Sequence, residues 1–166
     1  MQVGPQEVMT TKEYEDAMNI HFWAPLWTMK ACIPHFRQNK GEKIVNITSI
    51  GGKVAVPHML PYSASKFAFI GLSEGMQSEL QQDNIDVITA APYLMNTGSP
   101  RNITVRGDHE KEYAWFSLGD STPLTSINAE RAPGQIIEAA RNGDAELVIS
   151  VQAQLAAKFY ALFPGL

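Results

Sequence analysis

The sequence predicts an α/β fold built on a parallel sheet. Short runs rich in β-branched residues alternate with longer segments in which apolar residues recur at helical spacing. The order strand, helix, strand, helix, strand is typical of parallel strands joined by right-handed crossovers. The chain has 166 residues and 45% hydrophobic side chains, which suits one domain. We therefore expect residues 1–166 to form a single domain.

The first expected element is a long helix from Thr10 or Thr11 to just before Gly41. A threonine can cap the free amide groups of a first helical turn, and the acidic residues that follow suit the positive end of the helix dipole. Pro34 lies within this segment. Because proline has no backbone N–H for the helix ladder, we expect a kink there.

Three strands and two further helices follow. Two glycines come directly after the first strand and indicate a loop, and a glycine closes the second of these helices. The strands are expected at 43–49, 86–91 and 146–150, and the helices at 62–82 and 130–142. The tail 151–166 is expected to be helical, with Leu155, Phe159, Leu162 and Phe163 on one side. We expect this side to pack on its own domain or on a subunit partner, because a helix at a membrane surface would carry more basic residues.

Composition narrows the classes of partner. A net charge of -4 and a pI near 5.5 give no support for nucleic-acid binding, so small molecules are the expected partners. Cys32 is the single cysteine, so no internal disulfide can form, and the four histidines lack the spacing of a metal site. The sequence shows neither a membrane-spanning run nor a secretory signal, and a reduced, cytoplasmic setting is therefore expected.

Three side chains point to a reaction. Tyr62 and Lys66 are four residues apart in an expected helix, so they rise from the same face one turn apart. An unperturbed phenol has a pKa of about 10, and an adjacent ammonium lowers it. Ser49 ends a strand, at the edge of a parallel sheet where ligands bind. Together the three groups can polarise a carbonyl or an alcohol.

A Tyr-x-x-x-Lys pair is common by chance, and its context makes it specific. Ser49 at a strand end, the glycines after it and the run YSASK thirteen positions later occur together. In these residues the chain resembles the short-chain dehydrogenase/reductase family, and the match extends from Glu13 to Ser150. The resemblance implies a Rossmann-like doubly wound parallel sheet and an oxidoreductase that uses NAD or NADP to interconvert an alcohol and a carbonyl.

The same resemblance implies a role for each residue. Tyr62 would exchange a proton with the substrate oxygen, Ser49 would hydrogen-bond that oxygen, and Lys66 would also hold the ribose hydroxyls of the nicotinamide. Pro92 and Thr97 match cofactor-contacting positions of the family. Tyr93 stands where the family has glycine, and its side chain would crowd the cofactor.

The family builds its substrate lid in the region that corresponds to 94–126. Met95 and Trp115 are expected to contact the substrate there, and His58 is a candidate from the loop between the serine and the tyrosine. Because this region is apolar, we expect an apolar alcohol or ketone as substrate. His21 aligns with an asparagine that steadies a relay water in the family; it either takes over that role or is a polar filler, and we favour the filler.

The chain has no glycine-rich turn between a strand and a helix, which a dinucleotide site requires. The resemblance implies that the adenosine-binding half would precede Met1, so we expect a fold truncated at the N-terminus that keeps the nicotinamide end only. Such a chain is expected to show little or no turnover alone and to form homo-oligomers through its helices. The alternatives are a non-catalytic structural module and, more weakly, a hydrolase that uses Ser49, for which Ile47 occupies a position that requires glycine.

Overall fold

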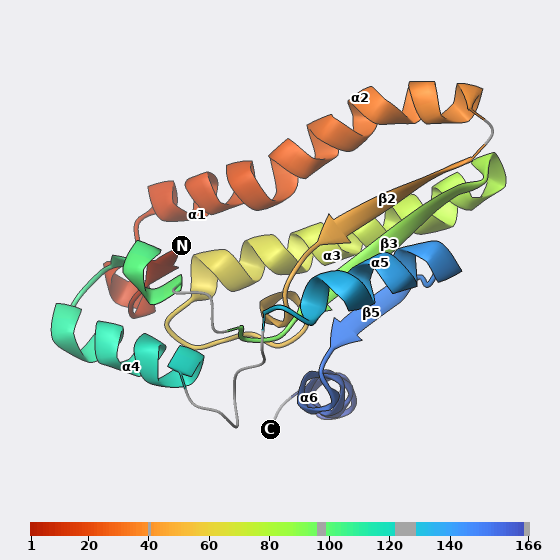
Figure 1. The fold of residues 1–166 in the computed structure, drawn as a ribbon. Helices are drawn as coiled ribbons and strands as arrows, with labels where there is room; N and C mark the ends of the chain where they lie inside the picture. Colours follow the sequence, from red (N-terminus) through yellow and green to blue (C-terminus); the bar gives the residue numbers. More distant parts are fainter. Residues whose placement is uncertain (40, 96–98, 122–128, 165–166) are drawn as a thin grey trace.

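The computed structural model describes residues 1–39, 41–95, 99–121 and 129–164 (Figure 1). Its strands are β1 (Gln2–Val3), β2 (Glu42–Ile47), β3 (Ile85–Pro92), β4 (Thr104–Val105) and β5 (Glu146–Ile149). Its α-helices are α1 (Thr11–Met18), α2 (Ala24–Gln38), α3 (Leu60–Leu80), α4 (His109–Ser121), α5 (Ala132–Asn142) and α6 (Val151–Leu162). Short helical turns lie at Gln6–Val8, Asn19–Trp23, Ile50–Gly52, Gln81–Asp83 and Ser99–Asn102.

The main sheet has the order β2-β3-β5, and all its pairs are parallel. This confirms the predicted sheet. The central strand β3 is buried along nearly its whole length, because it has a neighbour on either side and helices above it. Within the described part of the chain, β2 pairs on one side only.

The main hydrophobic core lies between the helices and this sheet. In Figure 1, α1 and α2 follow one another along one side of the molecule, and α6 lies on the opposite side beyond β5. The buried residues of this core come from α2, α3 and β3: Met29, Ile33, Leu80, Ile85 and Val87. The packing holds α3 against β3, so the first turn of α3 lies near the carboxyl end of the sheet.

The first helix differs from its expected continuous form. Asn19–Trp23 is a π-helical turn that separates α1 from α2, whereas Pro34 lies inside α2, which continues to Gln38. Pro25 follows this turn and has no N–H to donate to the carbonyl of His21 four residues earlier. A wider turn relieves this conflict, and such turns often occur at functional sites.

A second, two-stranded sheet was not expected from the sequence. β1 pairs in parallel with β4, with Gln2 opposite Thr104 and Val3 opposite Val105. This pairing attaches the region after β3 to the start of the chain. A small buried cluster of Val3, Met59 and Phe116 lies beside it and joins β1, the loop before α3, and α4.

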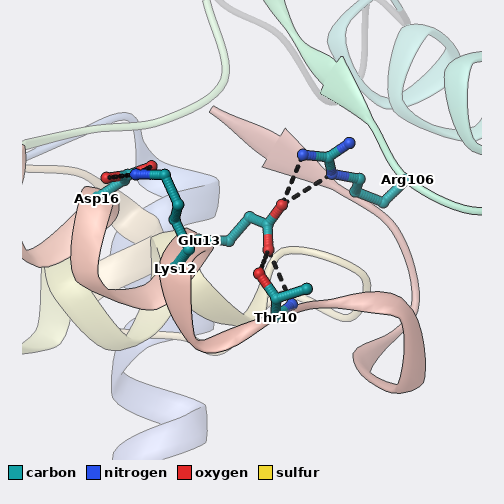
Figure 2. A network of polar contacts seen from close by, with 5 residues as sticks. All are labelled: Thr10, Lys12, Glu13, Asp16 and Arg106. Atoms are coloured by element: carbon teal, nitrogen blue, oxygen red, sulfur yellow. Dashed lines mark hydrogen bonds and ion pairs between the residues drawn. The ribbon is translucent and has the colours of Figure 1, made fainter.

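A polar network reinforces this attachment (Figure 2). The backbone N–H of Thr10 donates to Glu13 Oε2 at 2.8 Å, and Arg106, which follows β4, donates to Glu13 Oε1 from Nε at 2.8 Å. Hydrogen bonds from Thr10, joined by the interaction with Arg106, lower the pKa of Glu13 to about 2. An ionised Glu13 therefore ties the start of α1 to β4.

The apolar side of α6 was expected to pack on its own domain or on a subunit partner, and packing on its own domain is not found. The helix contacts the domain through Ala153, which is fully buried, while Leu155 and Leu162 are 64% and 73% exposed. Alanine permits this close approach, and the larger side chains point away. Among the described residues, no helix is both long and apolar enough to cross a lipid bilayer.

Candidate active site

Ser49 stands just beyond the carboxyl end of β2. The hydroxyl and the N–H of Thr48 both donate to the carbonyl of Ala90 on β3, at 2.8 and 2.7 Å, and so extend the pairing past the end of the strand. Ser49 then caps the short turn Ile50–Gly52, and the N–H of Gly51 donates to Ser49 Oγ at 3.1 Å. This bond directs the serine hydroxyl toward the first turn of α3.

Two glycines let α3 approach the strand end closely. A Cβ on Gly51 would lie 3.0 Å from Cε1 of Tyr62, and one on Gly52 would lie 2.6 Å from the carbonyl oxygen of Lys66. No side chain fits at Gly52 without a shift of the α3 backbone. The glycine pair therefore permits the juxtaposition of Ser49, Tyr62 and Lys66.

Tyr62 and Lys66 lie one turn apart on α3, as expected. Lys66 is buried, and its Nζ lies 5.7 Å from the centroid of the Tyr62 ring and 3.5 Å from the carbonyl oxygen of Ile47. Burial lowers the pKa of Lys66 to about 8. The group is still mostly protonated at neutral pH and can act as a cation beside the phenol.

The expected fall in the pKa of Tyr62 is not found. Burial raises the pKa of this phenol above its ordinary value of 10.0, and a hydrogen bond with Ser49 opposes that rise. The ammonium of Lys66 lies near the ring and donates to the backbone of Ile47, so it does not overcome the loss of solvent around the phenol. In this state Tyr62 carries its proton at neutral pH.

His21 contacts the same group of residues. The hydroxyl of Ser65 donates to the carbonyl of Tyr62 at 2.8 Å, so its oxygen is left to accept from His21 Nδ1, also at 2.8 Å. The imidazole meets the Tyr62 ring edge to face, with centroids 5.3 Å apart. Burial, helped by the charge of Lys66, lowers the pKa of His21 to about 4 and keeps it neutral.

The contact of Ser65 was not predicted from the sequence, where His21 was interpreted as a polar filler. One signal was available, since Pro25 stands four residues after His21 and marks the place where the helix must deviate. The π-helical turn that results holds His21 against α3.

A pocket of about 430 Å³ opens beside Ser49 and Tyr62. Pro92, at the end of β3, and Met95 line it, as does Tyr93, the residue that stands in place of the family glycine. Phe116 from α4 and Ala156 from α6 close its sides. Thr97, the other expected cofactor contact, lies outside the described residues.

His58 and Trp115 do not line this pocket, contrary to expectation. His58 Nδ1 lies 2.7 Å from Oε2 of Glu112, a buried carboxylate on α4, and the imidazole packs against the ring of Trp115. The two residues therefore join the loop before α3 to α4. The neighbouring positions Met59 and Phe116 face the pocket.

A second cavity, of about 550 Å³, lies between α2 and β2. Lys66 and His21 line it, and Ile47 borders both this cavity and the first pocket. Lys66 thus stands between a cavity at the unpaired side of β2 and the pocket at the end of the sheet. No cluster of histidine, cysteine or acidic side chains in the described ranges could hold a metal ion.

A parallel sheet with a serine, a tyrosine and a lysine converging at its carboxyl edge defines a class of nucleotide-dependent oxidoreductases. The family model described as short chain dehydrogenase matches residues 1–106. The chain belongs to this family, and the resemblance inferred from the motif is confirmed.

Two curated relatives illustrate the match. The chain is 37% identical over 113 residues to a 3-ketodihydrosphingosine reductase of Bacteroides thetaiotaomicron. The matched region covers 67% of this chain and 42% of the relative. It is 30% identical over 109 residues to human 17-beta-hydroxysteroid dehydrogenase 13. This matched region covers 63% of this chain and 36% of the relative. The chain thus spans less than half the length of either protein.

Solved structures show the same fold. A short chain dehydrogenase of Burkholderia cenocepacia in complex with NADP has a TM-score of 0.76 and 26% identity, over 96% of this chain and 59% of that one. A short-chain dehydrogenase of Streptomyces avermitilis has a TM-score of 0.81 at 22% identity, over 99% of this chain and 64% of that one.

Proposed function

We propose that the chain carries the proton-transfer side of an NAD- or NADP-dependent site that interconverts an alcohol and a carbonyl. The observation that carries this proposal is that Ser49 and Tyr62 line one pocket at the end of β2, while the Nζ of Lys66 lies 5.7 Å from the centroid of the Tyr62 ring. The names of the two curated relatives, a reductase of a keto compound and a hydroxysteroid dehydrogenase, support a carbonyl and alcohol pair as substrates.

Tyr62 is the proposed general acid and base. Its raised pKa keeps the phenol protonated at neutral pH, which suits donation of a proton to a carbonyl oxygen. Ser49 lies within hydrogen-bonding reach of the phenol and supplies a second hydroxyl for the same oxygen. For the reverse reaction, the cation of Lys66 favours the phenolate once a proton has left.

The residues present fit the nicotinamide end of a cofactor. Lys66 has three N–H donors and, within the described residues, one long hydrogen bond of 3.5 Å to Ile47, so donors remain for ribose hydroxyls. Pro92 and Tyr93 line the wall of the pocket at the end of β3. When bound, the nicotinamide supplies or accepts the hydride.

The decisive test compares two tyrosine substitutions. Because the chain spans 59% of the Burkholderia dehydrogenase, turnover is measured in a chimera that adds the uncovered part of that protein. Tyr62→Phe is expected to lower kcat by about 100- to 10,000-fold, as loss of a general acid does. Tyr113→Phe, an exposed position on α4, is the matched control and is expected to keep its activity.

An activity assay of the isolated chain provides a further test. We expect little or no oxidation of secondary alcohols with NAD or NADP by the 166 residues alone, because the chain has no glycine-rich turn to hold the phosphates. Substantial turnover by the isolated chain would refute this part of the proposal. Equal activity of Tyr62→Phe and Tyr113→Phe in the chimera would refute the catalytic role.

One observation favours a second candidate, a structural module that pairs with another subunit. Trp23 and Trp27 stack on each other with centroids 6.0 Å apart, and they are 42% and 59% exposed. A structural module would lose nothing in Tyr62→Phe and would lose self-association in Trp27→Lys, measured by sedimentation. The oxidoreductase proposal predicts the loss of turnover in the first variant.

A further inference from the structure

We propose that the pocket beside Ser49 and Tyr62 takes an uncharged, largely hydrocarbon ketone or secondary alcohol and rejects substrates with a carboxylate or phosphate next to the reacting carbon. This inference rests on the proposed function and names the substrate class of the same site.

The described walls carry no charged side chain. Of the sixteen described residues that line the pocket, none is aspartate, glutamate, lysine, arginine or histidine. Hydroxyl groups are contributed by Thr48, Ser49, Tyr62 and Tyr93. Three of these belong to one place, the carboxyl end of β2 and the first turn of α3, where the reacting oxygen would lie.

The nearby cations do not supply a counter-ion inside the pocket. Lys66 faces the other cavity, between α2 and β2, and its Nζ donates toward the carbonyl of Ile47. The side chain of His58 turns to Glu112. A carboxylate placed in the pocket would lose its hydration without gaining a partner among the described side chains, which is strongly unfavourable.

Met1 lines the pocket and carries an α-ammonium. Met1 packs its side chain on the cluster of Val3, Met59 and Phe116, and its α-ammonium is close enough to affect the pKa of His21. A free ammonium at Met1 would offer an anion a partner at the pocket. Acetylation of the N-terminus removes the charge and leaves every side chain in place.

The hydroxyl groups and the apolar wall of the pocket lie in different places. Its hydroxyl groups lie at the end of β2, whereas Val56, Met59 and Phe116 form an apolar wall continuous with the small buried cluster. A ketone oxygen directed at Ser49 and Tyr62 leaves its alkyl substituent against this wall. At about 430 Å³ the pocket has room for one compact ring together with a short alkyl ketone.

Binding to the N-acetylated chain tests the inference without any need for turnover. The ligands are hexyl methyl ketone and the α-keto acid in which a carboxylate replaces its methyl group. The chain is labelled with ¹³C at its methionine methyl groups. Met59 and Met95 line the pocket, Met29 lines the other cavity, and Met76 lies in neither, so each signal reports a different place.

The ketone is expected to shift Met59 and Met95 in a saturable manner, and the keto acid is expected to bind at least about 10-fold more weakly. Equal affinity for the two ligands overturns the proposal. Shifts confined to Met29, or no shift with either ligand up to the solubility limit of the ketone, also overturn it.

A charge introduced at Val54 provides the matched pair of variants. Val54 lines the pocket and is only half-buried, so a longer side chain can be accommodated. Val54→Lys is expected to reverse the preference in favour of the keto acid by about 10-fold, because it supplies the missing counter-ion. Val54→Met, of similar length and uncharged, is expected to keep the preference for the ketone.

The outcomes separate the two proposals. If the binding preference holds but the chimera shows no turnover that depends on Tyr62, the proposed reaction fails and the pocket still selects uncharged ligands. If turnover depends on Tyr62 but the keto acid binds as well as the ketone, the reaction stands and the substrate class is wrong.

Discussion

Replacing Gly52 with alanine is expected to destabilise the chain by forcing α3 away from the end of β2. The added methyl group would lie 2.6 Å from the carbonyl oxygen and 2.8 Å from the carbonyl carbon of Lys66. These are backbone atoms of a helix, so a side-chain rotation cannot relieve the contact. The Cδ1 atom of Ile70, at 2.7 Å, would also have to move.

The magnitude follows from this geometry. Overpacking of a tight interior site costs about 1–3 kcal/mol. Gly71 provides a control on the same helix, because a Cβ there meets nothing within 4 Å and the position is exposed. Alanine at an exposed, unhindered helical position is worth about 0.5–1 kcal/mol relative to glycine. The two substitutions, chemically identical, are therefore expected to change stability in opposite directions.

Urea unfolding followed by circular dichroism measures both effects. Gly52→Ala should lower the midpoint at an unchanged slope, and Gly71→Ala should raise it. Gly52→Ala should also weaken binding of hexyl methyl ketone, since it separates Ser49 from Tyr62. If Gly52→Ala proved as stable as the unchanged chain, the argument that this glycine sets the approach of α3 would be wrong.

Three further predictions concern single contacts. Because the pKa of Glu13 falls from 4.5 to about 2, its ionised side chain stabilises the fold above pH 4.5, and this stabilisation is lost as pH falls toward 2. Glu13→Gln should therefore flatten the fall of Tm in this range, whereas the exposed control Asp16→Asn should not. NMR titration should place the pKa of His21 near 4, and Lys66→Met should raise it only partway toward 6.5, since burial, the main cause, remains. Glu112→Leu removes the hydrogen-bond acceptor of His58 and should lower the local stability of α4 by about 1 kcal/mol. Amide hydrogen exchange in α4 should then be about fivefold faster, while the exchange rates in α2 stay unchanged.

Local patterns in the chain were sufficient for the main elements. The strands expected at 43–49, 86–91 and 146–150 are found as β2, β3 and β5, and the helix expected at 130–142 is found as α5, closed by Gly143 in a left-handed conformation. Periodicity and turn residues act over a few positions, so they can be recognised without knowledge of partners. The helix expected from Thr10 was only partly correct, because its π-helical turn depends on a conflict at Pro25.

The candidate site likewise contains residues that short-range rules bring together and contacts that only the folded chain brings together. Ser49, Tyr62 and Lys66 could be grouped because a strand end and one helical turn place them by short-range rules. The contact of His21 with Ser65 spans 44 positions, and that of His58 with Glu112 spans 54. No local rule relates such residues, and whether His58 faces a ligand or a carboxylate depends on where α4 lies.

The amino-acid order alone was enough to predict the parallel sheet, the family and the grouping of Ser49, Tyr62 and Lys66, because each is encoded in the order and spacing of residues along the chain. Folding in three dimensions was needed to pair β1 with β4, to leave the apolar side of α6 exposed, and to remove enough solvent from the Tyr62 phenol that its pKa rises. Those outcomes depend on which distant surfaces exclude water from one another, and exclusion of water is a property of the packed chain.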